Sequence, residues 1–340
     1  MIISRTPFRV SFVGGGSDLP AFCDRKTGAV LSVTIDKAMY LSLHPYFDRG
    51  KTLLRYSQAE LVEDVDRIEH PIFREALRWM GIKGGVEISS TADVPSGTGL
   101  GSSSSFTVAL LHVLSAYKSR YASKEFLGSA ASHLEIDVLG EPIGRQDQYA
   151  AAYGGLNVIE FYKNGEVRVE PVTVARQTLM DIDERLLMFY TGEQRATSSI
   201  LSDQAKGVAD EEQKFAATAK MVELVYEMRD ALFAGDLGAF GKILHRNWEL
   251  KRGLSKHISN PVVDEAYARA RKAGAGGGKL LGAGGGGFLL VYAEPKHHAK
   301  VRSALSDMSE LDFHFSLTGS SIIHTDGFDI EGAGGFFGGE

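Results

Sequence analysis

Residues 93–106 read Asp93-Val94-Pro95-Ser96-Gly97-Thr98-Gly99-Leu100-Gly101-Ser102-Ser103-Ser104-Ser105-Phe106. Before them, residues 85–90 alternate between apolar and polar side chains, as a strand does. After them, apolar residues recur at helical spacing as far as Tyr117. Glycines let a backbone approach an anion closely, and the N–H groups and dipole at a helix N-terminus attract negative charge. The stretch therefore predicts an anion-binding loop, in which a serine hydroxyl could ligate Mg²⁺. The alternative is a flexible serine-glycine linker, but the tight join to an amphipathic helix argues against it.

The composition is that of a soluble globular protein with room for two domains. The chain has 340 residues, of which 44% are hydrophobic and 24% charged, and a formal net charge of −6. No lysine or arginine run indicates nucleic acid or an anionic membrane as a partner, and no apolar run approaches the roughly 20 residues of a membrane span. The single cysteine, Cys23, allows no internal disulfide. We therefore expect a cytoplasmic protein that binds neither nucleic acid nor membranes.

The patterns before residue 180 predict mainly strands and three helices. We expect an N-terminal domain over 1–180, a C-terminal domain over 181–331 and a glycine-rich tail over 332–340. In the first domain we expect a strand over 1–13, a long strand pair over 29–46, a helix over 58–81 broken at Pro71, the helix after residue 101, a helix over 124–139 capped by Ser123, and a hairpin over 155–172 turning at a type I′ Asn164-Gly165 pair.

The second half has a different pattern, in which long helices dominate. We expect strands over 186–190, 279–281, 287–292 and 311–324, and helices near 195–206, 211–234, 236–256, 262–273 and 295–307.

A second glycine run, residues 282–287, formally matches the dinucleotide pattern G-x-G-x-x-G. That pattern indicates a dinucleotide site only between a strand and a helix, whereas here a strand follows. The Walker A pattern also fails, because Ala273 stands where its first glycine should be and Leu280 where Ser or Thr should be. We expect these glycines to let the turn press against another backbone loop. If the protein binds ATP, it uses a different loop.

Two carboxylates are candidates for chemistry. Asp147 lies between two glutamines in a short polar segment, where it could accept a proton from a substrate hydroxyl. Taken alone, it reads more simply as a solvated loop aspartate. Glu135 stands twelve residues upstream on a predicted helix. Two carboxylates that converge on a phosphate loop suit Mg²⁺, although an isolated Glu135 is more often an ordinary polar helix position.

Three motifs together resemble one family. Residues 95–105 resemble the phosphate loop, P-x-x-x-G-L-G-S-S-[AS]-[AS], of the galactokinase, homoserine kinase, mevalonate kinase and phosphomevalonate kinase (GHMP) superfamily. Residues 6–18, Thr-Pro-Phe-Arg-Val-Ser-Phe-Val-Gly-Gly-Gly-Ser-Asp, resemble its N-terminal motif. Residues 279–288, Lys-Leu-Leu-Gly-Ala-Gly-Gly-Gly-Gly-Phe, resemble its C-terminal glycine motif. The three occur in the family's order and cover nearly the whole chain, so the chain is identified as a member.

The resemblance implies an α+β fold, a cofactor and a set of site residues. The N-terminal domain would be like domain 2 of ribosomal protein S5 and the C-terminal domain ferredoxin-like, with ATP, Mg²⁺ and a small sugar substrate between them. By matching motifs, Asp147 and Arg9 would be catalytic, and Ser103 and Glu135 would hold Mg²⁺. ATP would contact Pro95, Gly97, Thr98, Gly99, Leu100, Gly101, Ser102, Ser103 and Ser104. The sugar would contact Asp18, Gly15, Gly16, Ser17, Gly284 and Gly285, with Arg145, Arg195 and Lys251 as candidates for a phosphate on the substrate.

A departure from the galactokinase pattern indicates a narrower branch. Galactokinases usually carry Glu-His where this chain has Gly15-Gly16. Together with residues 144–149 and 191–195, this resembles the branch of D-glycero-D-manno-heptose 7-phosphate kinases and fucose-salvage kinase domains. Because the latter usually sit in longer chains, a chain of 340 residues favours the heptose enzymes. The resemblance thus implies phosphorylation of the anomeric hydroxyl to give the 1,7-bisphosphate, on the route to nucleotide-activated heptose.

Other functions remain open from the sequence. One is L-fucose kinase or another sugar 1-kinase of the same branch. A second is a catalytically inactive sugar sensor on the same fold, and a third is a nicotinamide oxidoreductase. The adenine pocket and the oligomeric state, a homodimer included, are not readable from the residues.

Overall fold

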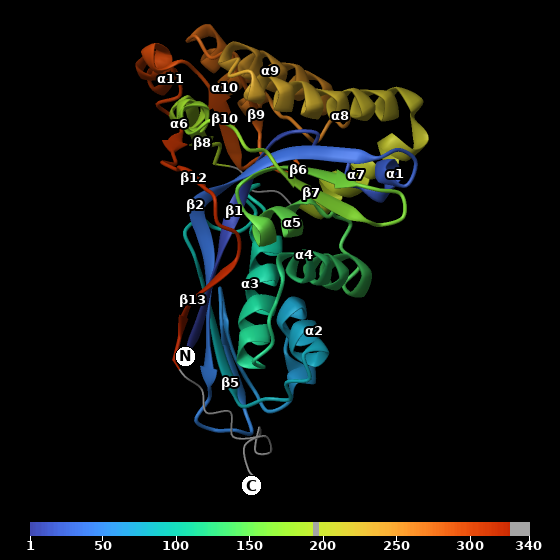
Figure 1. The fold of residues 1–340 in the computed structure, drawn as a ribbon, viewed down its shortest axis with the longest axis vertical. Helices are drawn as coiled ribbons and strands as arrows, with labels where there is room; N and C mark the ends of the chain where they lie inside the picture. The colour runs from blue at the N-terminus through green and yellow to red at the C-terminus, as the bar shows by residue number, and fades with distance from the viewer. Residues whose placement is uncertain (193–196, 327–340) are drawn as a thin grey trace.

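Two β-sheets with helices packed against them make up the protein (Figure 1). The structure is a computed structural model that describes residues 1–192 and 197–326. The larger sheet has the strand order β13-β1-β2-β5-β3-β4, with β12 and β6 also paired to β2, and β7 to β6. Its strands are β1 (Ile2–Val13), β2 (Gly28–Pro45), β3 (Thr52–Arg55), β4 (Ala59–Val62), β5 (Val86–Ala92), β6 (Leu156–Phe161), β7 (Val167–Pro171), β12 (Phe315–Ser316) and β13 (Ser321–Thr325).

The smaller sheet is antiparallel, with the order β11-β8-β10-β9. Its strands are β8 (Leu186–Tyr190), β9 (Gly277–Leu280), β10 (Phe288–Tyr292) and β11 (Ser309–Glu310). The helices of this half are α6 (Arg176–Glu184), α7 (Thr197–Asp210), α8 (Glu212–Phe233), α9 (Leu237–Arg252), α10 (Pro261–Lys272) and α11 (His298–Ala304), with a 3₁₀ turn at Pro295–His297. The predicted strands and long helices of the second half are therefore confirmed, except at its C-terminal end.

The helix α3 (Ser102–Tyr117) is the central helix of the first half and packs against β1 and β2. It is apolar almost all round, and side chains from Ser104 to Val113 are largely buried, as expected of a helix enclosed on several sides. Around it lie α2 (Pro71–Trp79), α4 (Lys124–Ser132) and α5 (Gln146–Tyr153), while the short α1 (Pro20–Cys23) contacts α7 of the second half (Figure 1).

Two strand predictions need correction. The expected strand pair over 29–46 is one continuous strand, β2, because its backbone pairs along its length with β1, β5 and β6 and no turn residue interrupts it. The expected last strand over 311–324 is two short strands, β12 and β13, which pair with β2 and β1 of the larger sheet. Residues 315–325 thus return to the sheet of the N-terminal half, and the domain division near residue 180 stays a prediction.

The predicted helix over 58–81 is wrong for its first half. Residues 59–62 form β4, a 3₁₀ turn follows at Val65–Arg67, and α2 begins only at Pro71. The Glu60 carboxylate explains the turn, because it accepts hydrogen bonds from the Glu69 and His70 N–H groups and from the Tyr56 hydroxyl. Such side-chain bonds offer the backbone an alternative to a helix that apolar spacing does not reveal.

The helix expected over 124–139 changes its hydrogen-bond pattern part-way. Ser123 accepts the Phe126 N–H and caps α4 as predicted, although Phe126 itself is exposed. From His133 to Val138 the chain forms a π-helical turn. Such turns are rare and often occur at functional sites, and this one carries Glu135.

The predicted hairpin is present as β6 and β7, but its turn is not type I′. That type needs a positive φ at both central residues, whereas here Gly165 has φ 83° and Asn164 does not have a positive φ. The Gly165 N–H instead bonds the Tyr162 carbonyl, and the Asn164 side chain accepts the Glu166 N–H.

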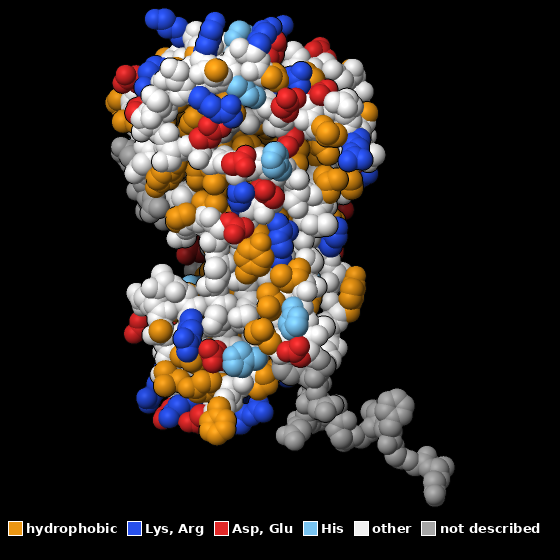
Figure 2. Space-filling model, turned by 90° about the vertical axis from the view of Figure 1, so that its left-hand side faces the viewer, with side chains coloured by type: hydrophobic (Ala, Val, Ile, Leu, Met, Phe, Trp, Pro, Cys, Tyr) orange, Lys and Arg blue, Asp and Glu red, His pale blue; other side chains and the backbone are white. Residues whose placement is uncertain are grey.

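The surface carries both signs of charge. Figure 2 shows acidic and basic side chains interspersed over the face that it displays. Among the helices of residues 1–192 and 197–326, none has both the length and the apolar character that crossing a bilayer requires.

Candidate active site

The N-terminus of α3 faces a cleft of about 330 Å³ between the two halves of the chain. Gly101 caps the helix with φ 75°, a conformation that glycine adopts without strain. The first helical bond runs from the Ser105 N–H to the Gly101 carbonyl, which leaves the N–H groups of residues 102–104 without helical partners. With Ser96, Gly97 and Gly99 also lining the cleft, this wall is suited to an anion such as a triphosphate.

The two glycine runs press against each other through their backbones. A Cβ on Gly99 would lie 2.5 Å from the Leu281 carbonyl oxygen, and one on Gly282 would lie 2.6 Å from the Gly99 Cα. A Cβ on Gly287 would overlap the Thr98 carbonyl oxygen, which also accepts the Phe288 N–H. The expected contact between the second glycine run and another loop is confirmed. Between β9 and β10, it is a turn that braces the phosphate loop rather than a dinucleotide site.

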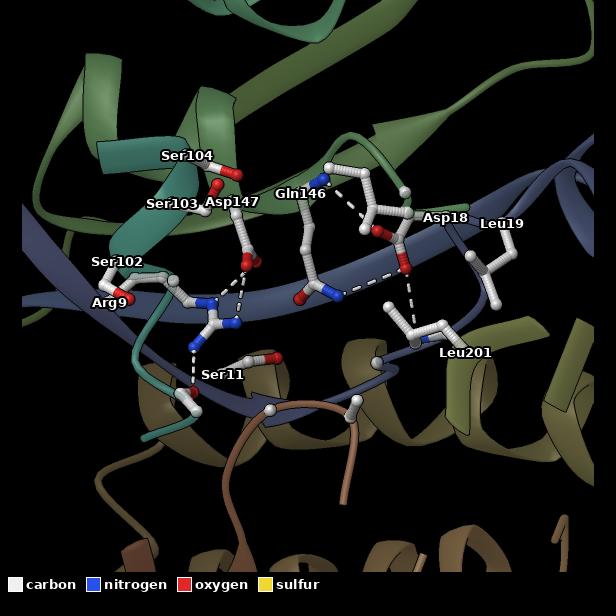
Figure 3. A pocket seen from close by; sticks show the side chains of 18 of the residues that line it. Arg9, Ser11, Asp18, Leu19, Ser102, Ser103, Ser104, Gln146, Asp147 and Leu201 are labelled. Atoms are coloured by element: carbon white, nitrogen blue, oxygen red, sulfur yellow. Dashed lines mark hydrogen bonds and ion pairs between the residues drawn. The ribbon is translucent and has the colours of Figure 1, made fainter. Parts of the chain in front are cut away.

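Arg9 and Asp147 form a bidentate ion pair in the cleft (Figure 3). Arg9 Nε donates to Asp147 Oδ1 at 2.7 Å, and Nη2 donates to Oδ2 at 2.8 Å. The third donor, Nη1, bonds the Gly99 carbonyl at 2.7 Å. Asp147 lies in the first turn of α5 rather than in a loop. Arg9 follows an irregularity in the β1–β2 pairing at Pro7, where proline has no N–H to donate. The sequence-predicted pair is therefore in contact.

Glu135 and Ser103 also meet. The Ser103 hydroxyl donates to Glu135 Oε1 at 2.8 Å, and Gln148 Nε2 donates to Oε2 at 2.7 Å. Glu135 is 1% exposed, and this burial raises the pKa of its carboxyl to about 6. Hydrogen bonds from Gln148 and Ser103 act in the opposite direction. An ionised carboxylate here would be stabilised by a cation.

The residues present fit a magnesium ion. Mg²⁺ prefers oxygen ligands and keeps several waters, and this corner of the cleft offers the buried Glu135 carboxylate and the exposed Ser103 hydroxyl. Ser103 and Glu135 would hold the ion, which would offset the negative charge of the nucleotide phosphates.

Asp18 lies at the far end of the cleft from α3 (Figure 3). It is 3% exposed and accepts hydrogen bonds from the Gly16 N–H and from both the backbone N–H and the side-chain amide of Gln146. Burial, and secondarily the charge of Asp147, raise the pKa of its carboxyl. Because the Gln146 amide nitrogen bonds Asp18, its oxygen faces away, buried and without a partner in the described chain. It is free to accept a hydroxyl.

Most sequence-predicted site residues line the cleft. They are Arg9, Gly15, Gly16, Asp18, Gly97, Gly99, Gly101, Ser102, Ser103, Ser104, Glu135, Asp147 and Lys251. Within the predicted phosphate loop, three residues have other positions. Leu100 is buried in the core, Pro95 is exposed and accepts the Thr98 hydroxyl, and the Thr98 carbonyl pairs with β10.

Four residues predicted to contact the sugar lie elsewhere. Ser17 exchanges two hydrogen bonds with the backbone of Ala29 and does not line the cleft. Arg145 turns its guanidinium to the Gly165 carbonyl at 2.6 Å and lines a neighbouring pocket. Gly284 and Gly285 pack on the backbone of Ile258. The Ser17 hydroxyl and one nitrogen of Arg145 are thus engaged within the chain. Arg195, like the tail over 332–340, lies outside the described residues.

Several cleft residues were missed at the level of sequence, among them Ser11, Gln146 and Lys279. Gln146 could have been predicted as a cleft residue, because it is adjacent to Asp147 in the sequence. Ser11 is two residues from Arg9 on β1, so both side chains face one side of the strand. Lys279 precedes the second glycine run and read as an ordinary strand residue, and its burial could not be foreseen.

Two family models match this chain. One describes the GHMP kinases N terminal domain and matches residues 59–155, and the other describes the GHMP kinases C terminal and matches residues 228–321. Together they cover more than half of the chain. The chain belongs to the GHMP kinases. It has the α+β fold of that family and is an ATP-dependent phosphotransferase, with ATP as its phosphoryl donor.

Relatives of this GHMP kinase include sugar kinases. A D-glycero-alpha-D-manno-heptose 7-phosphate kinase of Campylobacter jejuni is 28% identical over 342 residues, which cover 94% of this chain and 98% of the relative. A bifunctional fucokinase/GDP-fucose pyrophosphorylase of Arabidopsis thaliana is 28% identical over 90% of this chain, which spans 31% of that protein. The crystal structure of a D-glycero-D-manno-heptose 1-phosphate kinase from Bacteroides thetaiotaomicron matches with a TM-score of 0.80 at 25% identity, covering 96% of this chain and all of that one. This chain is thus a GHMP sugar kinase.

Proposed function

We propose that the protein transfers the γ-phosphoryl group of ATP to the anomeric hydroxyl of D-glycero-D-manno-heptose 7-phosphate. The product would be the 1,7-bisphosphate, a precursor of nucleotide-activated heptose. Because ATP is the donor, we propose a cytoplasmic site of action, with Mg²⁺ as the metal.

The position of the Arg9–Asp147 pair between the two ends of one cleft carries this proposal. The α3 N-terminus at one end suits the triphosphate, and Asp18 and Gln146 at the other end offer acceptors for sugar hydroxyls. The Arg9–Asp147 pair lies between them (Figure 3). A hydroxyl on the sugar would therefore approach the γ-phosphate beside Asp147.

Asp147, Arg9 and the α3 N-terminus then have distinct roles in phosphoryl transfer. Asp147 orients the C1 hydroxyl and accepts its proton as the oxygen attacks phosphorus. Arg9 fixes the carboxylate with two hydrogen bonds, and its charge offsets the negative charge of the transferring group. The N–H groups of residues 102–104, which have no partner within the helix, hold the phosphates in line.

The heptose relatives support the choice of sugar. The Campylobacter jejuni heptose 7-phosphate kinase aligns over nearly its whole length, and the Bacteroides structure carries a heptose name as well. The fucokinase relatives favour a second candidate, L-fucose kinase. The two substrates differ in charge, because heptose 7-phosphate already carries a phosphate and L-fucose carries none.

A panel of sugars tests the proposal. The purified protein, ATP and Mg²⁺ are incubated with heptose 7-phosphate, the unphosphorylated heptose, L-fucose and galactose, and the position of the new phosphate is determined by ³¹P and ¹H NMR. We expect the highest kcat/KM for heptose 7-phosphate, with phosphate at C1. A higher kcat/KM for L-fucose would replace the heptose by the second candidate, and phosphate at another carbon would contradict the proposed geometry.

A further inference from the structure

Two lysine side chains lie buried in the cleft without a carboxylate partner. Lys251 of α9 is 5% exposed, Lys279 of β9 is 4% exposed, and both line the cavity. Within residues 1–192 and 197–326, the hydrogen bonds of both ammonium groups go to neutral oxygens. A buried charge without a counter-charge is destabilising, so these positions favour an anion that comes from outside the chain.

The two ammonium groups have donors to spare. Lys251 Nζ donates to the Gly15 carbonyl at 3.1 Å and to Gln204 Oε1 at 2.8 Å, while Lys279 Nζ donates to the Ser11 carbonyl at 2.6 Å. Since an ammonium carries three N–H donors, one donor of Lys251 and two of Lys279 are unused in the described part of the chain. Burial lowers the pKa of Lys251 to about 8. Burial, with the charges of Lys251 and Arg9, holds the pKa of Lys279 well below its usual range.

A hydroxyl beside the lysines is also unsatisfied. Ser11 Oγ lines the cleft and is buried without a hydrogen-bond partner among the described residues. In the view of Figure 3, Ser11 lies below the Arg9 guanidinium. A phosphate oxygen at this place would accept from the hydroxyl and from both ammonium groups.

The charges that act on the two lysines are mainly positive. Besides burial, the charges of Lys251 and Arg9 lower the pKa of Lys279, and the pKa of Lys251 is raised by Asp18 and lowered by Arg9. Three further carboxylates line the cleft, those of Asp147, Glu135 and Glu141. Asp147 is committed to Arg9, and Asp18 accepts its hydrogen bonds from Gly16 and Gln146, although its charge favours the protonated form of Lys251. A dianionic phosphate would offset the remaining charge.

We propose that Lys251, Lys279 and the Ser11 hydroxyl form a phosphate-binding site in the floor of the cleft. Two phosphates can occupy it. One is the phosphate that the sugar already carries, a source that rests on the proposed function. The other is the γ-phosphoryl group of ATP, which would bind at this site beside Arg9.

Binding measurements on matched variants test the site. Lys251→Met and Lys279→Met remove the charge and keep an apolar stem. Lys242→Met is the control, because Lys242 lies on the same helix as Lys251 with its side chain exposed. Calorimetric titrations with heptose 7-phosphate, with the unphosphorylated heptose and with a non-hydrolysable ATP analogue give a Kd for each ligand.

Selective loss is the expected result. Losing a charge-assisted hydrogen bond weakens binding by about 10- to 100-fold. Loss for heptose 7-phosphate alone identifies the phosphate on the sugar as the occupant, and loss for the ATP analogue alone identifies the γ-phosphate. Equal Kd values in all variants, or an equal loss for all three ligands, would mean that the lysines only brace the cleft and would overturn the proposal.

A second variant covers the case in which the methionine variants do not fold. Ser11→Ala removes a hydroxyl that has no partner in the described chain, so it leaves the fold intact. We expect it to weaken the same ligand about 3- to 10-fold, and an unchanged Kd would contradict the site.

Inorganic phosphate separates this proposal from the proposed function. If the wild-type protein neither binds nor phosphorylates heptose 7-phosphate, the proposed sugar is wrong. The site is then tested by heating wild type and Ser11→Ala in inorganic phosphate and in chloride of equal ionic strength. Phosphate should raise the Tm of wild type more than that of the variant, whereas equal shifts would overturn the phosphate site.

Discussion

The Arg9 guanidinium holds two parts of the site at once. Two of its nitrogens bond the Asp147 carboxylate and the third bonds the Gly99 carbonyl in the phosphate loop. The proposed proton acceptor and the proposed nucleotide loop are therefore fixed relative to each other by one planar, rigid group. A lysine could not replace these three directed bonds.

The substitution Asp147→Asn tests the role of this carboxylate directly. The amide would keep the shape of the side chain but lose the charge and the capacity to accept a proton, so we expect kcat to fall about 10²- to 10⁴-fold. ATP should bind with an unchanged Kd, since in the proposed site its phosphates are held by the α3 N-terminus. Stopped assays give kcat, and titration with an ATP analogue gives the Kd. Asp48→Asn, in a loop outside the cleft lining, is the control. Undiminished turnover would remove Asp147 from the reaction.

Glu135 should make stability depend on pH. Its carboxyl has a pKa of about 6 in the folded chain, against an ordinary value of 4.5. The folded state then holds the proton more tightly than the unfolded state, so the free energy of unfolding falls as pH rises from about 4.5 to above 6, by about 2 kcal/mol in total. Glu135→Gln removes this dependence. We expect the variant to be the more stable form at pH 7.5 in EDTA and to lose this advantage below pH 4.5.

Urea unfolding at the two pH values measures this difference. Glu141→Gln is the matched control, because Glu141 lines the same cleft with an exposed side chain. In kinase assays, the Glu135→Gln variant should also require a far higher Mg²⁺ concentration than wild type to reach half of its maximal rate. A stability difference that is the same at both pH values would contradict the assignment of the titration to Glu135.

At the scale of elements, the contact between the two glycine runs explains why glycines occupy these positions. The two backbones approach too closely for a side chain to fit between them. Gly282 and Gly97 both have φ 75°, but a Cβ on Gly282 would meet the Gly99 Cα, whereas nothing lies within 4 Å of one on Gly97. Comparing a substitution at Gly97 with one at Gly282 therefore separates the energy cost of backbone strain from the energy cost of steric overlap.

We expect Gly97→Ala to lose about 1–2 kcal/mol of stability from the left-handed conformation alone. Gly282→Ala should lose about 1–3 kcal/mol more, because the two loops must move apart. Chemical denaturation of both variants measures the difference. Equal losses would show that the loops yield easily and that their contact is not tight.

The elements also show what the sequence can reveal. Apolar spacing and capping residues were sufficient to predict α3, the capped start of α4 and β8. The bounds of β8 match the predicted strand over 186–190. They failed at β4, where Glu60 bonds backbone groups nine and ten residues away. Apolar spacing alone does not distinguish such a turn from a helix.

The candidate site divides in the same way. The contacts of Asp147 with Arg9 and of Glu135 with Ser103 were predictable because the family motifs name them. Lys279 was not, because its burial depends on β1, which is distant in the sequence. Nor was the contact of Arg145 predictable, because the Gly165 carbonyl that it bonds belongs to a hairpin twenty residues away.

At the scale of the whole molecule, the last described strands tie the chain's end to its beginning. β13 pairs with β1, and the Thr34 hydroxyl bonds the Ser316 carbonyl. Gly154 and Gly319 approach so closely that a Cβ on Gly154 would overlap the Gly319 nitrogen. The N-terminal sheet is completed by residues that follow the C-terminal half.

A truncation measures this dependence. A chain that ends after Asp312 loses β12 and β13 and exposes the edge of β1. We expect its Tm to fall by about 10 °C or more relative to a chain that ends after Asp326 and keeps both strands, given about 2–4 °C per kcal/mol. A smaller difference would show that the larger sheet is stable without its last strands.

The contact of Gly99 with Gly282 also bears on the exchange of parts between related kinases. The two backbones are in contact at glycines, which have no side chains. No rotamer change can therefore relieve a steric clash between the two loops. A chimera that joins residues 1–180 of this chain to the second half of a relative would place loops from different parents in direct contact. Successful recombination will therefore require the stretches 96–101 and 281–288 to be inherited together.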